Sequence, residues 1–444
     1  MKHQVSLISL ILVSFCICLL LTQISFADAC EKCHQKNSPG IYLQWKNSNH
    51  GENDISCIDC HGAEEGDIDA FKHNGKLIAT IVSPKDCSQC HEKEAEQVGH
   101  SHHAKAGQIL QSLDAYLAHV AGGDPVAIAG CENCHGTRVE VDDNSPNKLS
   151  WKNWPNGGIG RINPDGSLGS CGACHTRHSF DRAQARQPET CGKCHLGPDH
   201  PQKEIFEESK HGNIYFSNID KMNLDSEEWV VGKDYYTAPT CATCHMSATS
   251  KQEVTHDVGE RISWTLRPAV SKLQENWETK RSNMQDVCTA CHSQPFINGH
   301  YTQYDGLVNL YNEKFAKPAG KVMKILKANK SLENPANFSN KVEWTYWEIW
   351  HHEGRRARHG AAMMGPDYTW WHGIYEVAQH FYFKFIPEVR ETGDKEAIAF
   401  LEDLLKNDPM HDWLSKPTAE LKADIKSGKI QEVYQHLFKT DLSK

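Results

Sequence analysis

The sequence CGACH at residues 171–175 is followed by CGKCH at residues 191–195, and the same Cys-x-x-Cys-His pentad occurs eight times along the chain. The chain has 444 residues with 18 Cys and 27 His, and only Cys16 and Cys18 lie outside these pentads. Chance would place roughly 0.04 such pentads in a chain of this composition, so a shared chemical role explains the repetition. The eight sets are Cys30/Cys33/His34, Cys57/Cys60/His61, Cys87/Cys90/His91, Cys131/Cys134/His135, Cys171/Cys174/His175, Cys191/Cys194/His195, Cys241/Cys244/His245 and Cys288/Cys291/His292.

The pentad is the pattern that attaches c-type haem. Its two thiols form thioethers with the two vinyl groups, and the adjacent histidine supplies the proximal imidazole to iron. Zinc ribbons need two Cys pairs for each metal and no histidine fixed after each pair, thioredoxin-like sites use one pair, and a disulfide framework does not demand the histidine. The sequence therefore predicts eight covalently bound c-type haems and leaves no cysteine after residue 27 for a disulfide.

The spacing of the pentads predicts how the haems pack. Successive pentads start 27, 30, 44, 40, 20, 50 and 47 residues apart, which is no fixed repeat. Roughly 33 residues for each haem are too few for eight separate small domains, and only 39% of the chain is hydrophobic. We therefore expect residues 28–292 to form one octahaem domain, in which packed haems serve as the core and exchange electrons rapidly.

The first 27 residues have the features of a secretory signal peptide. Lys2 precedes an apolar run from Val5 to Leu21, and Ser25-Phe26-Ala27 supplies the small residues of a cleavage site. A membrane anchor is the alternative, but the run is short for a membrane span. We expect an exported protein, in the periplasm or an equivalent extracytoplasmic compartment, whose mature chain has no membrane span.

The charge balance restricts the kind of partner. The formal net charge is −10, whereas nucleic-acid binding requires a basic surface, so we expect no nucleic-acid partner. Haem propionates add further negative charge. We expect the redox partner to be a small c-type cytochrome that docks through a complementary basic patch, with a salt-dependent on-rate.

More histidines remain than the haems need for a second axial position. A haem that only transfers electrons takes two axial ligands, whereas a catalytic haem leaves one position open for substrate. The pattern Ser-x-His recurs at His50, His103 and His211. It indicates a repeated task, although a surface Ser/His pair is the alternative and His102 competes with His103. The predicted distal ligands are His50, His73, His103, His119, His178, His211 and His256.

Residues 293–444 contain no pentad and have a helical pattern, with apolar residues every three or four positions and prolines between the runs. The predicted helices are 304–316, 321–329, 342–352, 368–385, 395–406 and 418–438, with an earlier helix at 104–120. Two aromatic clusters, at 344–350 and 368–375, either pack inside the fold or form an intersubunit surface. Arg355, Arg356 and Arg358 either pair with haem propionates or lie in a solvated basic turn.

The runs around the pentads resemble those of octahaem hydroxylamine oxidoreductases. The matching runs are CHTRHSF (174–180), CGKCHLGPDHPQ (191–202), SKHG (209–212), THDVGERISWTLRP (255–268) and RRARHGAAMMGPDYTWWHG (355–373). The resemblance covers nearly the whole mature chain. It implies a mostly α-helical multihaem cytochrome c and a homotrimer whose contacts, with part of the active site, lie in residues 293–444. It also implies seven electron-transfer haems with two His ligands each and one five-coordinate catalytic haem.

The resemblance also implies the residues of the active site. The catalytic haem would be the fourth, held by Cys131, Cys134 and His135, with the dipeptide Asp199-His200 above it. There, small nitrogen oxides would exchange electrons with iron while His200 relays protons and Asp199 orients His200. The alternative is a loop turn in which His200 is a distal haem ligand.

Tyrosines decide the expected direction of the reaction. Tyr301, with Tyr304 as the alternative, would reach the pocket. In hydroxylamine-oxidising members a Tyr of the neighbouring subunit is bonded to the catalytic haem, and we expect its position within residues 360–363, where this chain has none, although Tyr368 lies nearby. The resemblance therefore favours reduction of nitrite to hydroxylamine or ammonia. The alternatives are hydroxylamine oxidation to nitric oxide or nitrite, and a cytochrome that only transfers electrons.

Overall fold

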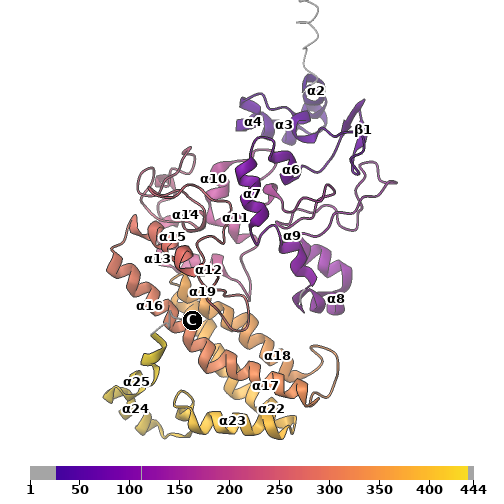
Figure 1. Ribbon diagram of the computed structural model, residues 1–444. Coiled ribbons are helices and arrows are strands. Elements are labelled where there is room, and N and C mark those ends of the chain that lie inside the picture. The colour runs from indigo at the N-terminus through magenta and orange to yellow at the C-terminus, as the bar shows by residue number, and fades with distance from the viewer. Residues whose placement is uncertain (1–26, 112, 439–444) are drawn as a thin grey trace, which may run out of the picture. The chain divides into compact units, whose positions relative to one another are not determined.

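The computed structural model describes residues 27–111 and 113–438 (Figure 1), so the predicted signal peptide lies outside the described residues except for Ala27. Helices make up 57% of the structure and strands are few, which confirms the mostly α-helical fold. The described residues form two compact units: one contains those up to 99 together with those between 103 and 181, and the other contains 100–102 together with those from 182 onward. The first unit carries pentads one to five. The second carries pentads six to eight together with the haem-free helices, and the boundary at residue 292 stays a prediction.

Short helices and one hairpin form the first unit. The helices are α2 (Ala27–Asn37), α3 (Pro39–Lys46), α4 (Asn49–Glu52), α5 (Cys57–His61), α6 (Pro84–Cys87), α7 (Glu92–His100), η1 (Ala106–Gln111), α8 (Leu113–Val126), η2 (Ala127–Cys131), α9 (Glu132–His135) and η3 (Cys171–Ala173). Strands β1 (Phe71–His73) and β2 (Lys76–Ile78) pair antiparallel, with His73 opposite Lys76. The predicted helix 104–120 is instead a 3₁₀ turn and then α8, which bends at Gly123, where φ is +63°.

Several pentads form single helical turns, which brings residues three and four apart onto one face. Ser or Thr side chains cap these turns. The Ser56 amide donates to Asp59 Oδ2 at 2.7 Å before α5, and the Ser83 amide donates to Asp86 Oδ2 at 2.8 Å before α6. Thr240 caps α14 (Cys241–His245) in the same way. Because α5 and α14 each contain a whole pentad, their caps help to fix the two thiols and the imidazole on the same side of the helix.

Longer helices form much of the second unit. Its helices are α10 (Arg182–Arg186), α11 (Pro188–Gly192), α12 (Gln202–Glu208), α13 (Lys210–Phe216), η4 (Ile219–Lys221), α14, α15 (Trp277–Thr289), α16 (Gln294–Leu310), η5 (Tyr311–Ala316), α17 (Lys317–Ala328), α18 (Lys341–Trp347), η6 (Glu348–Glu353), α19 (Gly354–Ala362), α20 (Pro366–Thr369), η7 (Trp370–Tyr375), α21 (Glu376–His380), η8 (Phe381–Phe385), α22 (Ile386–Glu391), α23 (Lys395–Asn407), η9 (Asp412–Ser415), α24 (Thr418–Ser427), α25 (Lys429–Gln435) and η10 (His436–Phe438). Their apolar faces meet in a core that includes Tyr311, Phe315, Val322, Phe381 and Phe385, all at most 1% exposed.

Three of these runs are continuous helices interrupted only by π-helical turns: residues 294–328, 341–362 and 366–391. The sequence pattern predicts that Pro318 and Pro387 separate helices, but neither proline ends one. Each follows a π-helical turn inside a continuous helix. A π-helical turn shifts the hydrogen-bond register, so the missing proline N–H is tolerated there. Conversely, the predicted helix 418–438 breaks at Gly428, where φ is +87° and favours glycine.

The structure also shows which residues of the aromatic clusters and of the arginine run are buried. Trp347 is 5% exposed and packs inward, whereas Trp370, Trp371 and Tyr375 are 45–56% exposed. Of the two alternatives for the arginines, the solvated basic turn is wrong, because residues 355–358 belong to helix α19. Its guanidinium groups bind protein atoms: that of Arg358, for example, is fully buried and donates to the Gly354 and Pro268 carbonyls. None of the described helices is long and apolar enough to cross a membrane.

Candidate metal centres and active site

Among the described residues, four predicted distal histidines face the proximal histidine of a different part of the chain. The ring centres are 6.2 Å apart for His73 and His34, 6.2 Å for His50 and His91, 6.2 Å for His178 and His61, and 6.1 Å for His211 and His292. A metal–nitrogen bond of about 2.1 Å and roughly 1.1 Å from nitrogen to ring centre place two axial rings about 6.4 Å apart. The spacing therefore fits one iron between each pair of rings.

The Ser-x-His pattern has a structural explanation at two of its three positions. Ser48 Oγ accepts a hydrogen bond from the Gly51 amide at 3.2 Å, and Ser209 Oγ accepts one from the Gly212 amide at 3.1 Å. Each serine thus caps a short helix whose second residue is the histidine. A side chain at either glycine would collide with a nearby carbonyl, of Trp45 or of Phe206. Serine and glycine together hold His50 and His211 in place.

The protonation of these histidines suits metal binding. Burial, followed by the facing ring, lowers the pKa of His50, His178 and His211. The neutral imidazole is the form that binds metal, so a lowered pKa favours the ligating state.

The remaining predicted distal ligands are His103, His119 and His256. His103 and His256 are half-buried, His102 is exposed, and His119 is exposed on α8 close to Glu132 of the fourth pentad. Their roles stay predictions.

The cysteines of the pentads are partly accessible to solvent rather than buried in a hydrophobic core. All sixteen are half-buried or exposed, although cysteine is among the most frequently buried residues in proteins. Within residues 27–111 and 113–438, no group of three or more His, Cys, Asp and Glu side chains could hold a metal ion by itself. Thiols on open faces and rings spaced for iron together fit c-type haem.

The second cysteine of a pentad lies one turn after the first. In the fifth pentad the Cys174 and His175 amides donate to the Cys171 carbonyl at 3.2 and 3.0 Å, and both side chains are half-buried. The second cysteines of the sixth and eighth pentads donate to the first in the same way, at 3.2 and 3.1 Å. This turn holds a pentad together. The haem-binding role of the individual pentad residues stays a prediction; among these residues are Cys33, Cys174, His175, Cys194 and Cys291.

Two of these thiols lie close to the solvent. Asn37 Nδ2 donates a hydrogen bond to Cys33 Sγ at 3.2 Å, across one turn of α2. Cys291 is exposed at the end of the eighth pentad. An exposed free thiol is an unfavourable feature, so a thioether to haem would explain why cysteine stands at position 291.

Neighbouring pentads lie close together within each unit. In the first unit the adjacent thiols are Cys30 and Cys57, Cys60 and Cys90, and Cys87 and Cys171. In the second unit they are Cys191 and Cys241, then Cys244 and Cys288. Haems attached at these positions would be close neighbours within each unit.

The fourth pentad, predicted to carry the catalytic haem, spans η2 and α9 in the first unit. The Ile159 amide donates to the Cys134 carbonyl at 3.0 Å, and the Gly160 amide donates to the His135 carbonyl at 3.0 Å. Gly158 and Gly160 approach this backbone so closely that a side chain at either would collide with it. A glycine-rich segment therefore braces the residue expected to hold the catalytic iron.

Asp199 and His200 lie in the second unit, in the loop between the sixth pentad and α12. Asp199 Oδ1 is 3.4 Å from His200 Nε2, and Asp199 Oδ2 accepts from Arg355 Nη1 at 3.1 Å. His351 Nε2 is 3.9 Å from the same Oδ2, and burial lowers the pKa of the neighbouring His352 to about 4. Sequence reasoning missed Arg355, His351 and His352 as neighbours of this pair, because all three lie more than 150 residues further along the chain.

Two features of the environment of the His200 ring bear on its role. It lies 6.0 Å from the ring of His195, the proximal histidine of the sixth pentad, a spacing close to that of the four pairs. Its Nδ1 is buried without a hydrogen-bond partner, while its Nε2 faces Asp199. The first observation suits the alternative role as a distal ligand, and the second suits proton transfer.

Tyr301 lies on α16, beside the eighth pentad. It is 9% exposed, packs with Trp264 and Cys288, and its ring is 4.6 Å from the guanidinium of Arg281. Burial raises the pKa of Tyr301. Arg281 in turn binds both oxygens of Asp305, at 2.7 and 2.8 Å. This buried ion pair, which sequence reasoning did not identify, fixes the surroundings of Tyr301, whose role in the pocket stays a prediction.

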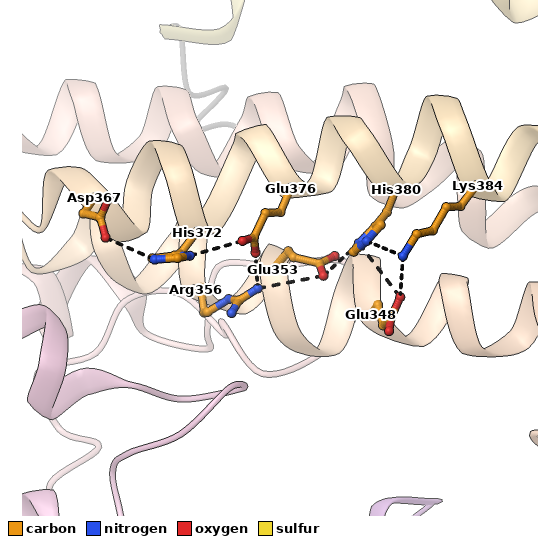
Figure 2. A network of polar contacts seen from close by, with 8 residues as sticks. All are labelled: Glu348, Glu353, Arg356, Asp367, His372, Glu376, His380 and Lys384. Atoms are coloured by element: carbon orange, nitrogen blue, oxygen red, sulfur yellow. Dashed lines mark hydrogen bonds and ion pairs between the residues drawn. The ribbon is translucent and has the colours of Figure 1, made fainter.

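A chain of charged side chains joins helix 366–391 to η6 and α19 (Figure 2). His380 Nδ1 is 2.9 Å from Glu353 Oε1, and Arg356 Nη2 is 2.5 Å from Glu376 Oε2. Glu376 also contacts His372 at 3.1 Å. Arg356, which sequence reasoning connected with haem propionates, is therefore engaged by carboxylates of its own chain.

Comparison with known proteins gives matches along most of the chain. The family model "Seven times multi-haem cytochrome CxxCH" matches residues 166–333, and the model "Cytochrome c554 and c-prime" matches residues 86–153. A probable nitrite reductase–hydroxylamine oxidoreductase fusion protein of Kuenenia stuttgartiensis is 23% identical over 78% of this chain and 49% of its own length. The chain thus spans about half the length of that curated relative.

Two solved structures have a similar fold. A hypothetical multiheme protein superposes with a TM-score of 0.71 and 26% identity, over 86% of this chain and 96% of its own. A chain of a reducing HAO-like protein complex of Kuenenia stuttgartiensis superposes with a TM-score of 0.59 and 20% identity, over 85% and 87%.

Proposed function

We propose that this chain, a hydroxylamine-oxidoreductase-like multihaem cytochrome c, reduces nitrite to hydroxylamine or ammonia at the haem of its fourth pentad. The proposal includes eight covalent haems, seven of them for electron transfer. It makes Cys131, Cys134 and His135 the holders of the catalytic haem. Hydroxylamine oxidation is the alternative reaction.

The direction rests on one observation, the composition and packing of residues 360–363. The resemblance connects oxidation with a tyrosine bonded to the haem from this segment, which here contains Gly360, Ala361 and Ala362 but no Tyr. A side chain at position 360 would collide with the backbone of Tyr368 and Thr369. Ala361 and Ala362 pack against the cluster that contains Tyr301. The segment has neither a tyrosine nor room for one at position 360, which favours the reductive reaction.

An open c-type haem supplies a site that binds the nitrogen of small nitrogen oxides and exchanges electrons with it. Reduction of nitrite also consumes protons, so an acid–base group is needed near the substrate. The resemblance gives this task to His200, whose Nδ1 is buried and unbonded while Asp199 faces its Nε2. The paired rings, such as His61 and His178, are suited to haems that only transfer electrons.

The names of the relatives support a nitrogen-oxide substrate. The curated relative is named for both nitrite reduction and hydroxylamine oxidation, and one solved structure is titled a reducing complex. For the assembly we propose a homotrimer, with Trp370, Trp371 and Tyr375 as exposed aromatic residues available for subunit contact. We also propose a periplasmic location, since multihaem c-type cytochromes are typically extracytoplasmic, and a small c-type cytochrome as electron donor.

The test compares the two directions in the haem-loaded protein. Nitrite reduction with an artificial donor should be faster than hydroxylamine oxidation with an artificial acceptor, and the ferric protein should show a high-spin signal that nitrite changes. Peptide mapping that finds Tyr368, or another tyrosine, bonded to the haem of Cys131 and Cys134 would restore the oxidative reaction. A wholly low-spin spectrum would support a cytochrome that only transfers electrons.

A further inference from the structure

Arg355 of α19 binds a carboxylate that lies 156 residues away in the sequence. Its Nη1 donates to Asp199 Oδ2 at 3.1 Å, and the two side chains are only 7% and 20% exposed. A charge-assisted hydrogen bond so shielded from water is stronger than one at the surface. One oxygen of the proposed catalytic carboxylate is therefore fixed by a residue of the haem-free region.

Arg355 is itself held in place by several groups. Its Nε donates to the Arg267 carbonyl at 2.8 Å, and its Nη1 is 3.0 Å from His351 Nε2. The His351 ring stacks on Trp347, with ring centres 3.9 Å apart, and Trp350 lies 5.1 Å from the guanidinium. Because the guanidinium is already ordered, little conformational entropy remains to be lost when it binds Asp199.

The other oxygen of the carboxylate is directed at His200. Asp199 Oδ1 is 3.4 Å from His200 Nε2, and the opposite ring nitrogen is buried without a hydrogen-bond partner. A hydrogen bond between Oδ1 and Nε2 would leave Nδ1 as the atom that gives or takes a proton. The carboxylate thus lies between the guanidinium and the imidazole, so displacement of the guanidinium would also displace the imidazole.

We propose that Arg355 is a positioning residue, which holds Oδ2 of Asp199 so that Oδ1 orients the imidazole of His200 for proton transfer. The inference rests on the proposed function, because that function gives Asp199 and His200 their task. It adds that the haem-free helices set the geometry of the proton-transfer group.

The experiment uses the haem-loaded full chain and a matched control. Arg355→Gln removes the charge, and Arg355→Lys keeps it. Lys cannot reach both the Arg267 carbonyl and Asp199, because an ammonium group lacks the forked donors of guanidinium. Arg356→Gln is the control, since Arg356 is the next residue of the same helix but binds Glu376 instead. Asp199→Asn completes a double-mutant cycle with Arg355→Gln.

A positioning role predicts a specific set of results. For R355Q the kcat of nitrite reduction should fall about 10- to 100-fold with little change in KM, because misplacement of a reacting group acts on the transition state. R355K should recover only part of this loss, and R356Q should stay close to the wild type. On a D199N background R355Q should cause no further loss, because residues that act together are not additive. A crystal structure of R355Q should show the Asp199 carboxylate displaced.

Other outcomes would overturn the inference. Wild-type kcat in R355Q, additive losses in the double variant, or an unmoved Asp199 in the R355Q crystal would each do so. If R355Q does not fold, R355K provides the same comparison. A wild-type protein with no activity on nitrite or hydroxylamine would refute the proposed function instead, and the crystal structures would still decide whether Arg355 positions Asp199.

Discussion

Removal of the Asp305 carboxylate should destabilise the protein strongly. Asp305 accepts hydrogen bonds from Arg281 at 2.7 and 2.8 Å and from Trp264 Nε1 at 2.8 Å. The Arg281 and Asp305 side chains are 11% and 6% exposed. Asp305→Ala leaves the guanidinium buried and without this partner, and loss of one member of a buried pair costs about 3–5 kcal/mol. At about 2–4 °C for each kcal/mol, the melting temperature should fall by roughly 6–20 °C.

The assay is thermal unfolding of the haem-loaded protein, followed by circular dichroism. Glu402→Ala is the control, because Glu402 forms a comparable 2.7 Å pair with Arg390 whose side chains are 54% and 47% exposed. Such exposed pairs contribute about 0–1 kcal/mol. Asp305→Asn keeps the size of the side chain and should have an intermediate effect. Equal shifts for Asp305→Ala and Glu402→Ala would show that burial does not strengthen this pair and would refute the reasoning.

Three further predictions concern haem number, ligation and pH. Intact mass of the haem-loaded chain should exceed that of residues 28–444 by eight haems, and six or fewer would end the octahaem interpretation. His178→Ala should convert one low-spin haem to high spin in the electron paramagnetic resonance spectrum, because its ring faces His61, and an unchanged spectrum would exclude that pairing. Burial lowers the pKa of Lys314 to about 8, below the 10.5 of an unfolded chain, so the unfolded state binds more protons between these values and stability should rise with pH there. Lys314→Met should remove about 3 kcal/mol of this dependence, and equal pH profiles for both proteins in urea unfolding would contradict the assignment.

The pentads are read directly from the sequence, and several of the histidines that face them could be predicted from it, because these features depend on local chemistry. The Ser-x-His pattern at His50 and His211 is a helix cap, and a cap is encoded within four residues. Which proximal ring each histidine faces was not predictable. His50 faces His91 rather than the nearer His34, a choice made by tertiary packing.

The polar contacts around the proposed active site illustrate the same limit. Asp199 was identified from its run of sequence, but its partner Arg355 lies 156 residues away and was interpreted as a propionate ligand or a surface turn. A basic run in a helical pattern does not reveal which face of the helix is buried. The continuity of helices across Pro318 and Pro387 was missed for a related reason, since proline is a reliable helix end only where the α-helical register is kept.

The π-helical turn at Glu348–Glu353 allows the helix before α19 to tolerate a change of one residue in length. Such a turn holds one residue more than an α-helical turn, and each residue rotates an α-helix by about 100°. A single-residue deletion within this turn would return it to the α-helical hydrogen-bond pattern and leave α19 close to its place, so Arg355 would stay near Asp199 and Arg356 near Glu376. A deletion within α19 itself would instead rotate the residues after it by about 100° and misalign their contacts.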